Sequence, residues 1–233
     1  MTMKFVKLSY TGKLEDGKVF DTTDAETARK NKIFDEKRIY KPISIIVGEG
    51  HVIKGLDEAL KDAKVGDKKT VNVTPENGYG PRNPELVRLV PMRVFKKQNI
   101  RPIPGMVIDI DGRPARIQTV AGGRVRVDLN HELAGRTLNF DVKVESEAKT
   151  DMEKIDCLID RSFNDVDGFK ISAEGKKIRI TLPENASRDR NLLIRKASLA
   201  AELFKYIEAE QVDFVEEWKN PKKETKGVAK AGT

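Results

Sequence analysis

Cysteine is nearly absent from the sequence: of 233 residues, only Cys157 carries a thiol. A single thiol excludes an intrachain disulfide, so the fold has to depend on a packed core, and a reducing compartment is acceptable. The opening residues contain no apolar run long enough for a signal peptide, and no stretch approaches the roughly 20 apolar residues of a membrane span. We therefore expect a cytoplasmic protein with no membrane segment.

Histidine is almost as scarce, with only His51 and His131 in the chain. The sequence offers no Ser/His/Asp or Cys/His constellation, no glycine-rich phosphate loop, and no CxxC or HxxxH spacing for a metal. An enzyme with this sequence has to work without a nucleophile, a metal or a cofactor, and we expect none of the three. His131 is expected to have a structural hydrogen-bonding role, whereas His51 is left open between a structural and a functional role.

Glutamine occurs at only three positions, whereas charged residues make up 35% of the chain. Few amides and thiols together with many Lys, Glu and Arg residues are typical of proteins that work at high temperature, which predicts a thermophilic source. The net charge of +7 is uneven: residues 86–131 carry nine Lys or Arg and three Asp or Glu, and residues 219–233 carry five Lys and one Glu. These basic segments are either solvated surface with a disordered tail or a contact for nucleic acid.

Alternating and β-branched segments predict a first set of strands in the N-terminal part of the chain. They are KFVKLSY, the return strand VFDTT after a Glu-Asp-Gly turn, ISIIVG and KKTVNVTP, with a short helix at residues 55–60 and a polar helix or loop at residues 25–37. TLNFDVKVES alternates as well but has no partner nearby. We predict that it returns to the sheet of the first domain.

Two further segments differ in pattern from the first. Between the first strands and the returning one, four strand-like stretches are separated by Asp-Gly and Gly-Gly turns, which predicts a separate small β module. From residue 150 onward, the pattern becomes helix, hairpin, helix and strand, which predicts a small α+β domain. Its second helix has one apolar stripe (Leu193, Ala197, Ala200, Phe204, Ile207) and a second apolar set off that axis (Leu192, Leu199, Leu203).

The order of four motifs resembles a known family. VKLSYTGKLEDGKVFD, SIIVGEGHVIKGLDEAL, VGDKKTVNVTPENGYG and NHELAGRTLNFDVKV follow one another in the chain. They are similar to the FKBP-type peptidyl-prolyl cis–trans isomerases, and more narrowly to the SlyD-like subgroup, in which a chaperone domain interrupts the isomerase between GYG and NHELAG. The segment after residue 150 resembles what long archaeal members of this group carry as an extra C-terminal domain.

The resemblance implies an α+β fold, with a half-wrapped antiparallel sheet around one short helix. We expect four segments: a main domain formed by residues 1–85 and 132–149, an insert formed by residues 86–131 with a chaperone-like β fold, a C-terminal module formed by residues 150–218, and a disordered basic tail at residues 219–233. That tail contains neither His nor Cys, so the metal binding of some SlyD-like tails is not implied.

The resemblance also implies a pocket that binds the proline of a substrate. Tyr10, Asp21, Tyr79 and Phe140 would be its catalytic residues, and Phe20, Ile43, Ile45, Val52, Ile53 and Leu56 would complete its lining. Leu56 and Ile43 replace aromatic residues of the family pattern, which enlarges or softens the pocket. From the residues alone, the apolar members of this set would simply be core residues of strands and helices.

The expected function is acceleration of X–Pro isomerisation in unfolded or nascent chains, without covalent chemistry. In the insert, apolar residues among basic ones are candidates for binding such clients by strand addition: Leu89, Val90, Met92, Val94 and Phe95. The same residues could instead form only the core of the insert. Two other functions remain open, a non-catalytic holdase and a ribosome- or RNA-associated adaptor. The C-terminal module is expected either to form a homodimer or to pack on the main domain.

Overall fold

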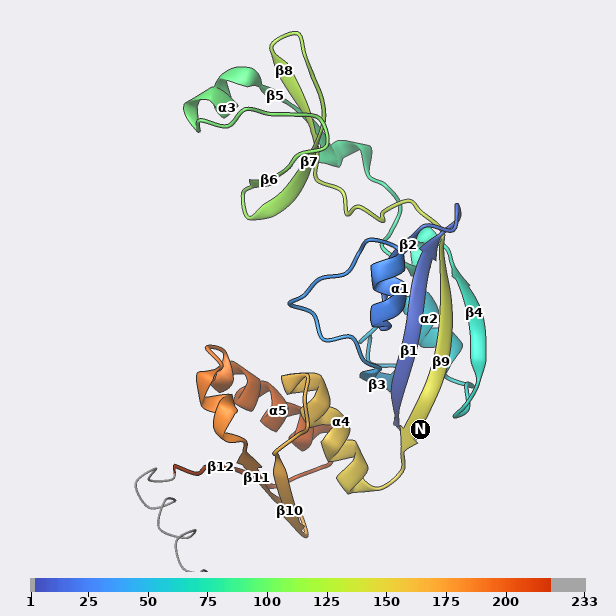
Figure 1. The fold of residues 1–233 in the computed structure, drawn as a ribbon, viewed down its shortest axis with the longest axis vertical. Helices are drawn as coiled ribbons and strands as arrows, with labels where there is room; N and C mark the ends of the chain where they lie inside the picture. The colour runs from blue at the N-terminus through green and yellow to red at the C-terminus, as the bar shows by residue number, and fades with distance from the viewer. Residues whose placement is uncertain (1–2, 219–233) are drawn as a thin grey trace, which may run out of the picture.

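The computed structural model describes residues 3–218 and has three parts arranged along its long axis (Figure 1). The main domain lies in the middle, the insert lies beyond one end of its sheet, and the C-terminal module lies at the other end. Mainly antiparallel sheets and separate helices confirm the predicted α+β class. The predicted disordered tail, residues 219–233, lies outside the described residues.

The main domain is built on one antiparallel sheet. Its strands are β1 (Lys4–Leu14), β2 (Val19–Thr22), β3 (Ile43–Val47), β4 (Lys68–Val73) and β9 (Leu138–Ala148). The order is β2-β1-β9-β4, and β3 pairs with the first half of β1 beside β2. Val142 of β9 pairs with Tyr10 of β1 on one side and with Lys69 of β4 on the other. The prediction that this late strand returns to the first sheet is therefore correct.

One face of this sheet is covered by helix α2 (Lys54–Leu60), and the smaller helices α1 (Ala25–Lys30) and η1 (Pro75–Asn77) lie in the connections. Leu56 and Leu60 of α2 are buried against the sheet residues Leu8 and Leu138. A Cβ atom on Gly55 would lie 2.7 Å from Cγ1 of Val73. Glycine at this position therefore lets the helix lie directly on β4.

The insert forms its own sheet with a small core. Its elements are η2 (Pro84–Leu86), β5 (Val87–Pro91), α3 (Met92–Lys97), β6 (Val107–Ile110), β7 (Arg113–Ala121) and β8 (Arg124–Asp128). The strand order is β5-β8-β7-β6, so β5 and β6 are the edges. Helix α3 was not predicted. It directs Phe95 into the core, beside Ile117 and Val127.

The C-terminal module contains two helices and a three-stranded sheet. Its elements are α4 (Asp151–Phe163), β10 (Lys170–Glu174), β11 (Lys177–Leu182), η3 (Glu184–Arg188), α5 (Leu192–Tyr206) and β12 (Gln211–Glu216). The hairpin β10–β11 is antiparallel, and β12 adds to β11 in parallel. A capping box between Thr150 and Glu153 begins α4.

This module packs on the main domain through a mixed apolar and polar contact. The rings of Phe5 and Tyr206 meet edge to face with centroids 6.1 Å apart. The buried carboxylate of Asp160 forms an ion pair with Lys41 and accepts a hydrogen bond of 2.6 Å from the hydroxyl of Ser44. Because a buried carboxylate is costly without partners, these contacts hold α4 in one place on β3.

The two apolar sets of α5 have different environments. Leu199, Leu203 and Tyr206 are buried, whereas Leu193 and Phe204 of the longer stripe are 77% and 48% exposed. Both sets repeat at helical spacing, so the sequence could not show which one faces α4 and the sheet. Leu193, Ala197 and Phe204 of the longer stripe are therefore at the surface, whereas Ile207 packs against the core cluster of the module.

Candidate active site

A pocket of about 440 Å³ opens on the covered face of the main sheet, between the sheet, α2 and the segment after β4. We call it the aromatic pocket. It is lined by Tyr10, Phe20, Asp21, Ile43, Gly50, His51, Val52, Ile53, Leu56, Tyr79 and Phe140. Elements far apart in the sequence thus contribute to one cavity.

Nine of the ten residues expected in the pocket lie in this lining; Ile45 does not. The side chain of Ile45 is in the core of the main domain and also borders a second cleft, of about 520 Å³, next to α4. Ile43 and His51 border both spaces. Residues 43 and 45 lie on the same face of β3, but Ile45 is buried in the core whereas Ile43 is half-buried at the pocket.

Three aromatic rings form the inner wall. Phe140 meets Phe20 edge to face with centroids 5.6 Å apart, and it meets Tyr10 in a tilted contact at 6.1 Å. A Cβ atom on Gly12 would lie 2.6 Å from the ring of Phe20 and 3.0 Å from that of Phe140. Gly12 is therefore required for these rings to pack as they do. Its role was missed, because Gly12 lies beyond the strand predicted at residues 4–10, and a glycine there carries no signal about the rings above it.

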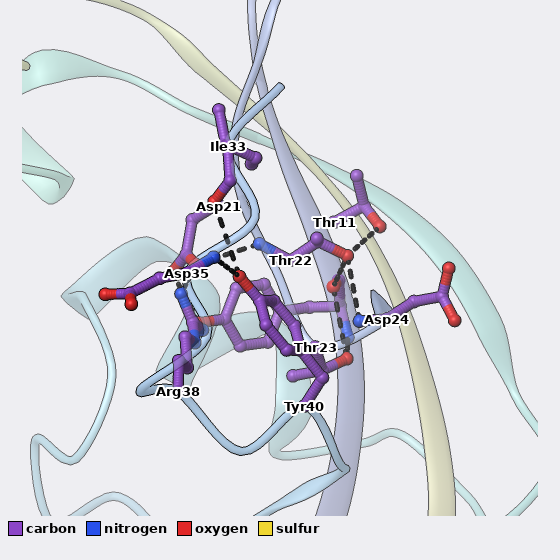
Figure 2. Close-up of polar contacts among 10 residues, drawn as sticks. Thr11, Asp21, Thr22, Thr23, Asp24, Ile33, Asp35, Arg38 and Tyr40 are labelled. Carbon is purple, nitrogen blue, oxygen red and sulfur yellow. Dashed lines mark hydrogen bonds and ion pairs between the residues drawn. The ribbon is translucent and has the colours of Figure 1, made fainter. Parts of the chain in front are cut away.

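The polar rim of the pocket is a connected network. The Tyr10 hydroxyl donates to Oδ2 of Asp21 over 2.6 Å, and Arg38 forms an ion pair with Oδ1 of the same carboxylate. Figure 2 shows Arg38 approaching Asp21 from the loop that follows α1, in which the Tyr40 hydroxyl accepts from the backbone N–H of Asp35. Burial, and then the bond to Asp21, raises the pKa of Tyr10 well above its usual value. Arg38 was not predicted, because nothing in the sequence places its loop beside β2.

Tyr79 lies at the mouth of the pocket. Its ring stacks face to face on His131, with centroids 4.1 Å apart and an interplanar angle of 4°. Nδ1 of His131 accepts a hydrogen bond from the backbone N–H of Leu133. Burial raises the pKa of Tyr79, and the negative charge of Asp21 adds to this effect. The structural role expected for His131 thus includes support for a pocket residue.

His51 borders the pocket on the side of the C-terminal module. Its Nδ1 accepts from the backbone N–H of Ile46 over 3.1 Å. Burial lowers the pKa of His51, and the positive charge of Arg161 on α4 lowers it further. The neutral ring therefore has its Nε2 as the N–H donor.

The five client-binding candidates of the insert are not equivalent. Leu89 on β5 and Val94 on α3 are exposed, Val90 and Met92 are half-buried against the insert core, and Phe95 is buried. Phe95 is therefore not available to a client, because α3 turns it inward. The sequence also missed three exposed apolar side chains of the insert, Ile103, Met106 and Val107.

Other functional features were sought among the described residues, 3–218. No group of three His, Cys, Asp or Glu side chains in this range could hold a metal ion. No helix in the same range has the length and apolar character needed to cross a membrane. Cys157 is buried in α4, where burial raises the pKa of its thiol, so it is not a reactive nucleophile.

Comparison with known proteins gives two family models and several relatives. The model described as FKBP26, IF domain, matches residues 88–133, and the model described as FKBP26_C-terminal matches residues 151–219. The short-type peptidyl-prolyl cis–trans isomerase of Methanocaldococcus jannaschii is 44% identical over 140 residues, which cover 60% of this chain and 88% of that protein.

Two bacterial relatives are more distant. The FKBP-type 16 kDa peptidyl-prolyl cis–trans isomerase of Escherichia coli K12 is 32% identical over 143 residues, covering 60% of this chain and 87% of that protein. The FKBP-type peptidyl-prolyl cis–trans isomerase SlyD of Haemophilus influenzae is 32% identical over 154 residues, covering 64% and 73%. The chain therefore belongs to the FKBP-type peptidyl-prolyl cis–trans isomerases, enzymes that act on proline-containing polypeptides.

Proposed function

We propose that the aromatic pocket binds the proline of a substrate chain and accelerates its cis–trans isomerisation. The observation that carries this proposal is the convergence of Tyr10, Phe20, Tyr79 and Phe140, with apolar residues of β3 and α2, on one cavity. A cavity of about 440 Å³ is large enough for a prolyl ring and its neighbouring peptide groups. Leu56 at its floor leaves room that a larger aromatic side chain would fill.

The mechanism follows from the nature of the barrier. Rotation about a peptide bond costs about 18–20 kcal/mol because resonance gives the C–N bond partial double-bond character. X–Pro bonds populate both isomers but exchange in tens to hundreds of seconds. The twisted transition state has lost that resonance and is less dipolar. An apolar pocket that removes water from the dipolar ground state therefore favours the twisted form, which is catalysis by differential binding.

The polar groups of the rim orient the substrate and do not transfer protons. Tyr79 is 39% exposed at the mouth, and its hydroxyl is the donor that we propose for a substrate carbonyl. Tyr10 and Arg38 hold the Asp21 carboxylate in a fixed position beside the pocket. Both oxygens of this carboxylate already have partners, Oδ2 the Tyr10 hydroxyl and Oδ1 the Arg38 guanidinium.

We expect kcat/KM for a blocked X–Pro peptide to be constant between about pH 6.5 and pH 9.5. The raised pKa values of Tyr10 and Tyr79 keep both hydroxyls protonated up to the alkaline limit, and the lowered pKa of His51 keeps its ring neutral down to the acidic one. Line-shape or exchange NMR on the peptide gives the rate at each pH.

A bell-shaped profile inside this window would contradict the mechanism, because it would show that a titrating group takes part in the reaction. Absence of any acceleration would instead favour the alternative function, a holdase that binds unfolded chains without turnover. A protein whose refolding is limited by a proline provides the second substrate for this distinction.

We propose that the insert gives the enzyme a second, chaperone-like function. β5 and β6 are edge strands, and exposed apolar side chains lie on both, Leu89 on β5 and Val107 on β6. An extended client can add to such an edge through its backbone, independently of its sequence. The half-exposed Met106 adds an adaptable apolar contact.

We also propose that the exposed stripe of α5 forms a two-fold contact between two copies of the chain. Leu193, Ala197 and Phe204 lie at spacings of four and seven residues on one exposed side of α5, and Ile194 beside them is 70% exposed. A patch of this kind on a monomer is usually covered by a partner. A dimer would present two inserts to one long client.

The full chain is expected to be dimeric at micromolar concentration, and Leu193→Glu combined with Phe204→Glu is expected to make it monomeric. Both positions are exposed, so the fold should persist. Light scattering gives the mass. Met152→Glu, at an exposed apolar position of α4, serves as the control and should leave the dimer intact. A monomeric wild-type chain at this concentration would contradict the proposed contact.

A further inference from the structure

A second cavity lies where the insert joins the main domain. It has a volume of about 600 Å³ and we call it the junction cavity. Its lining comes from β6, β7, the end of β8 and the two connecting segments: Arg82, Val107, Arg113, Pro114, Arg116, Gln118, Asp128, Leu129, Asn130, His131, Glu132 and Arg136. None of these residues lines the aromatic pocket.

The junction cavity is positively charged. Four arginines border it, against two carboxylates. Arg82 forms an ion pair with Asp128, and Arg116 forms one with Glu132. Arg113 and Arg136 form no ion pair within the described range 3–218, so their guanidinium groups are available to an anion. Guanidinium groups bind carboxylates through paired N–H donors.

The connecting segments hold this cavity in a defined shape. Asp128 accepts hydrogen bonds from the side chains of Gln118 and Asn130, in addition to its ion pair with Arg82. Burial raises the pKa of Asp128, but the hydrogen bonds from Asn130 and the charge of Arg82 outweigh this effect. The pKa of Asp128 is therefore below its usual value. Gly135 donates its backbone N–H to the carbonyl of Gly80 across the two segments. These contacts fix the backbone around the cavity arginines before any client binds.

The junction cavity and the aromatic pocket adjoin at two stacked rings. His131 lines the former, Tyr79 lines the latter, and the two rings lie 4.1 Å apart. An extended chain advances about 3.3–3.6 Å per residue. A client whose proline is in the aromatic pocket therefore passes the junction cavity within a few residues of that proline.

We propose that the junction cavity is a subsite for an acidic side chain of the client, with Arg113 and Arg136 as its specificity-determining residues. This inference rests on the proposed function of the aromatic pocket. Charge complementarity identifies an acidic polypeptide segment as the occupant. One face of the His131 ring, which could otherwise stack on a nucleobase, is occupied by Tyr79.

A peptide series tests the subsite in the full chain. Blocked peptides share one X–Pro core and carry a single aspartate, asparagine or lysine at each of three positions before or after it. At low salt, the aspartate peptide is expected to exceed the asparagine peptide about threefold to fivefold in kcat/KM at one or more positions, and the lysine peptide to fall below it. In 1 M salt, the difference should disappear.

Arg113→Gln combined with Arg136→Gln should abolish the preference and leave the asparagine peptide unchanged. Arg124→Gln combined with Arg126→Gln is the matched control, because these exposed arginines of β8 make the same change in charge without lining the cavity. The control should retain the preference.

Equal rates for the aspartate and asparagine peptides at every position would overturn the proposal. A preference that survives in the Arg113/Arg136 variant, or is lost equally in the control, would do so as well. Binding of an RNA oligomer that depends on Arg113 and Arg136, without any effect on peptide preference, would overturn it in favour of a nucleic-acid site. If the wild-type chain does not accelerate the asparagine peptide at all, the proposed function of the aromatic pocket is wrong. This outcome is distinct from the loss of a preference for aspartate, which concerns the junction cavity alone.

Discussion

Excision of residues 84–129, with Asn83 joined to Asn130 by a short glycine–serine linker, is expected to preserve peptide isomerisation and to reduce catalysis of protein refolding roughly a hundredfold. In the whole enzyme, a client held on the insert presents its prolines to the aromatic pocket as an intramolecular neighbour. Without the insert, each proline has to bind the pocket from solution. A short peptide without acidic residues is expected to gain nothing from the insert or from the junction cavity, so its rate measures the aromatic pocket alone.

The structure indicates where the chain can be cut. The backbone N–H of Asn83 donates to the side chain of Asn130 over 2.8 Å, and the side chain of Asn130 donates to the carbonyl of Asn83 over 2.9 Å. The two residues are therefore adjacent and a few linker residues can connect them. This cut keeps His131, on which Tyr79 stacks. A cut that removed residue 131 would also disturb the mouth of the aromatic pocket. The effect of losing the insert could then not be separated from the effect of a damaged pocket.

Point variants provide a milder version of the same experiment. Leu89→Ser and Val107→Ser remove exposed apolar side chains from the two edge strands of the insert, and Val65→Ser removes one of similar exposure from the main domain. Refolding catalysis should fall for the first two and remain unchanged for the third. In the excision experiment, an equal loss of peptide isomerisation and of refolding catalysis would contradict the proposal that the two functions are separable.

Most of the fold was predictable because each strand carries its own local signal. Alternating residues identified β1, β4 and β9, and the Asp-Gly and Gly-Gly turns located the hairpins of the insert. The position of β9 was predictable for a different reason: an alternating strand with one face to bury needs a sheet, and only the main sheet had a free partner.

The errors occur where two packings have the same local pattern. Helix α3 contains both an exposed Val94 and a buried Phe95, and the apolar character of the segment did not distinguish them. On α5, the sequence left open which apolar set is buried; Leu193 and Phe204 are exposed, and Leu199 and Leu203 are buried. In both cases the side that is buried is decided by which element packs against the helix, and this is a property of the tertiary structure.

The candidate site was only partly accessible from the sequence. Similarity to a family located the aromatic residues, since their motifs are contiguous. Arg38, Gly12 and the arginines of the junction cavity have no such motif, and they act on the site through segments that meet only in the folded chain. The placement of the aromatic pocket between the junction cavity and the cleft beside α4 is also a result of folding.

Tyr79→Ala and Phe140→Ala are each expected to lower kcat/KM for a blocked X–Pro peptide about tenfold or more, but with different effects on stability. Tyr79 is exposed at the mouth, so its truncation removes the ring and hydroxyl that contact the substrate at little cost to the fold. Phe140 is 5% exposed and supports Tyr10 and Phe20. Its truncation should also cost about 3–5 kcal/mol of stability.

Three companion variants keep the result interpretable. Phe140→Leu retains most of the buried volume, so a folded protein with reduced kcat/KM would separate the role of the ring from that of the core. Tyr79→Phe removes only the hydroxyl, so the fall in kcat/KM in this variant measures the contribution of the hydrogen bond to the substrate carbonyl. Phe34→Ala is the control, since Phe34 stacks on Tyr40 outside the pocket lining. Denaturant unfolding and peptide kinetics on the same samples decide the matter: unchanged kcat/KM in folded Tyr79→Ala and Phe140→Leu proteins would remove catalysis from the aromatic pocket.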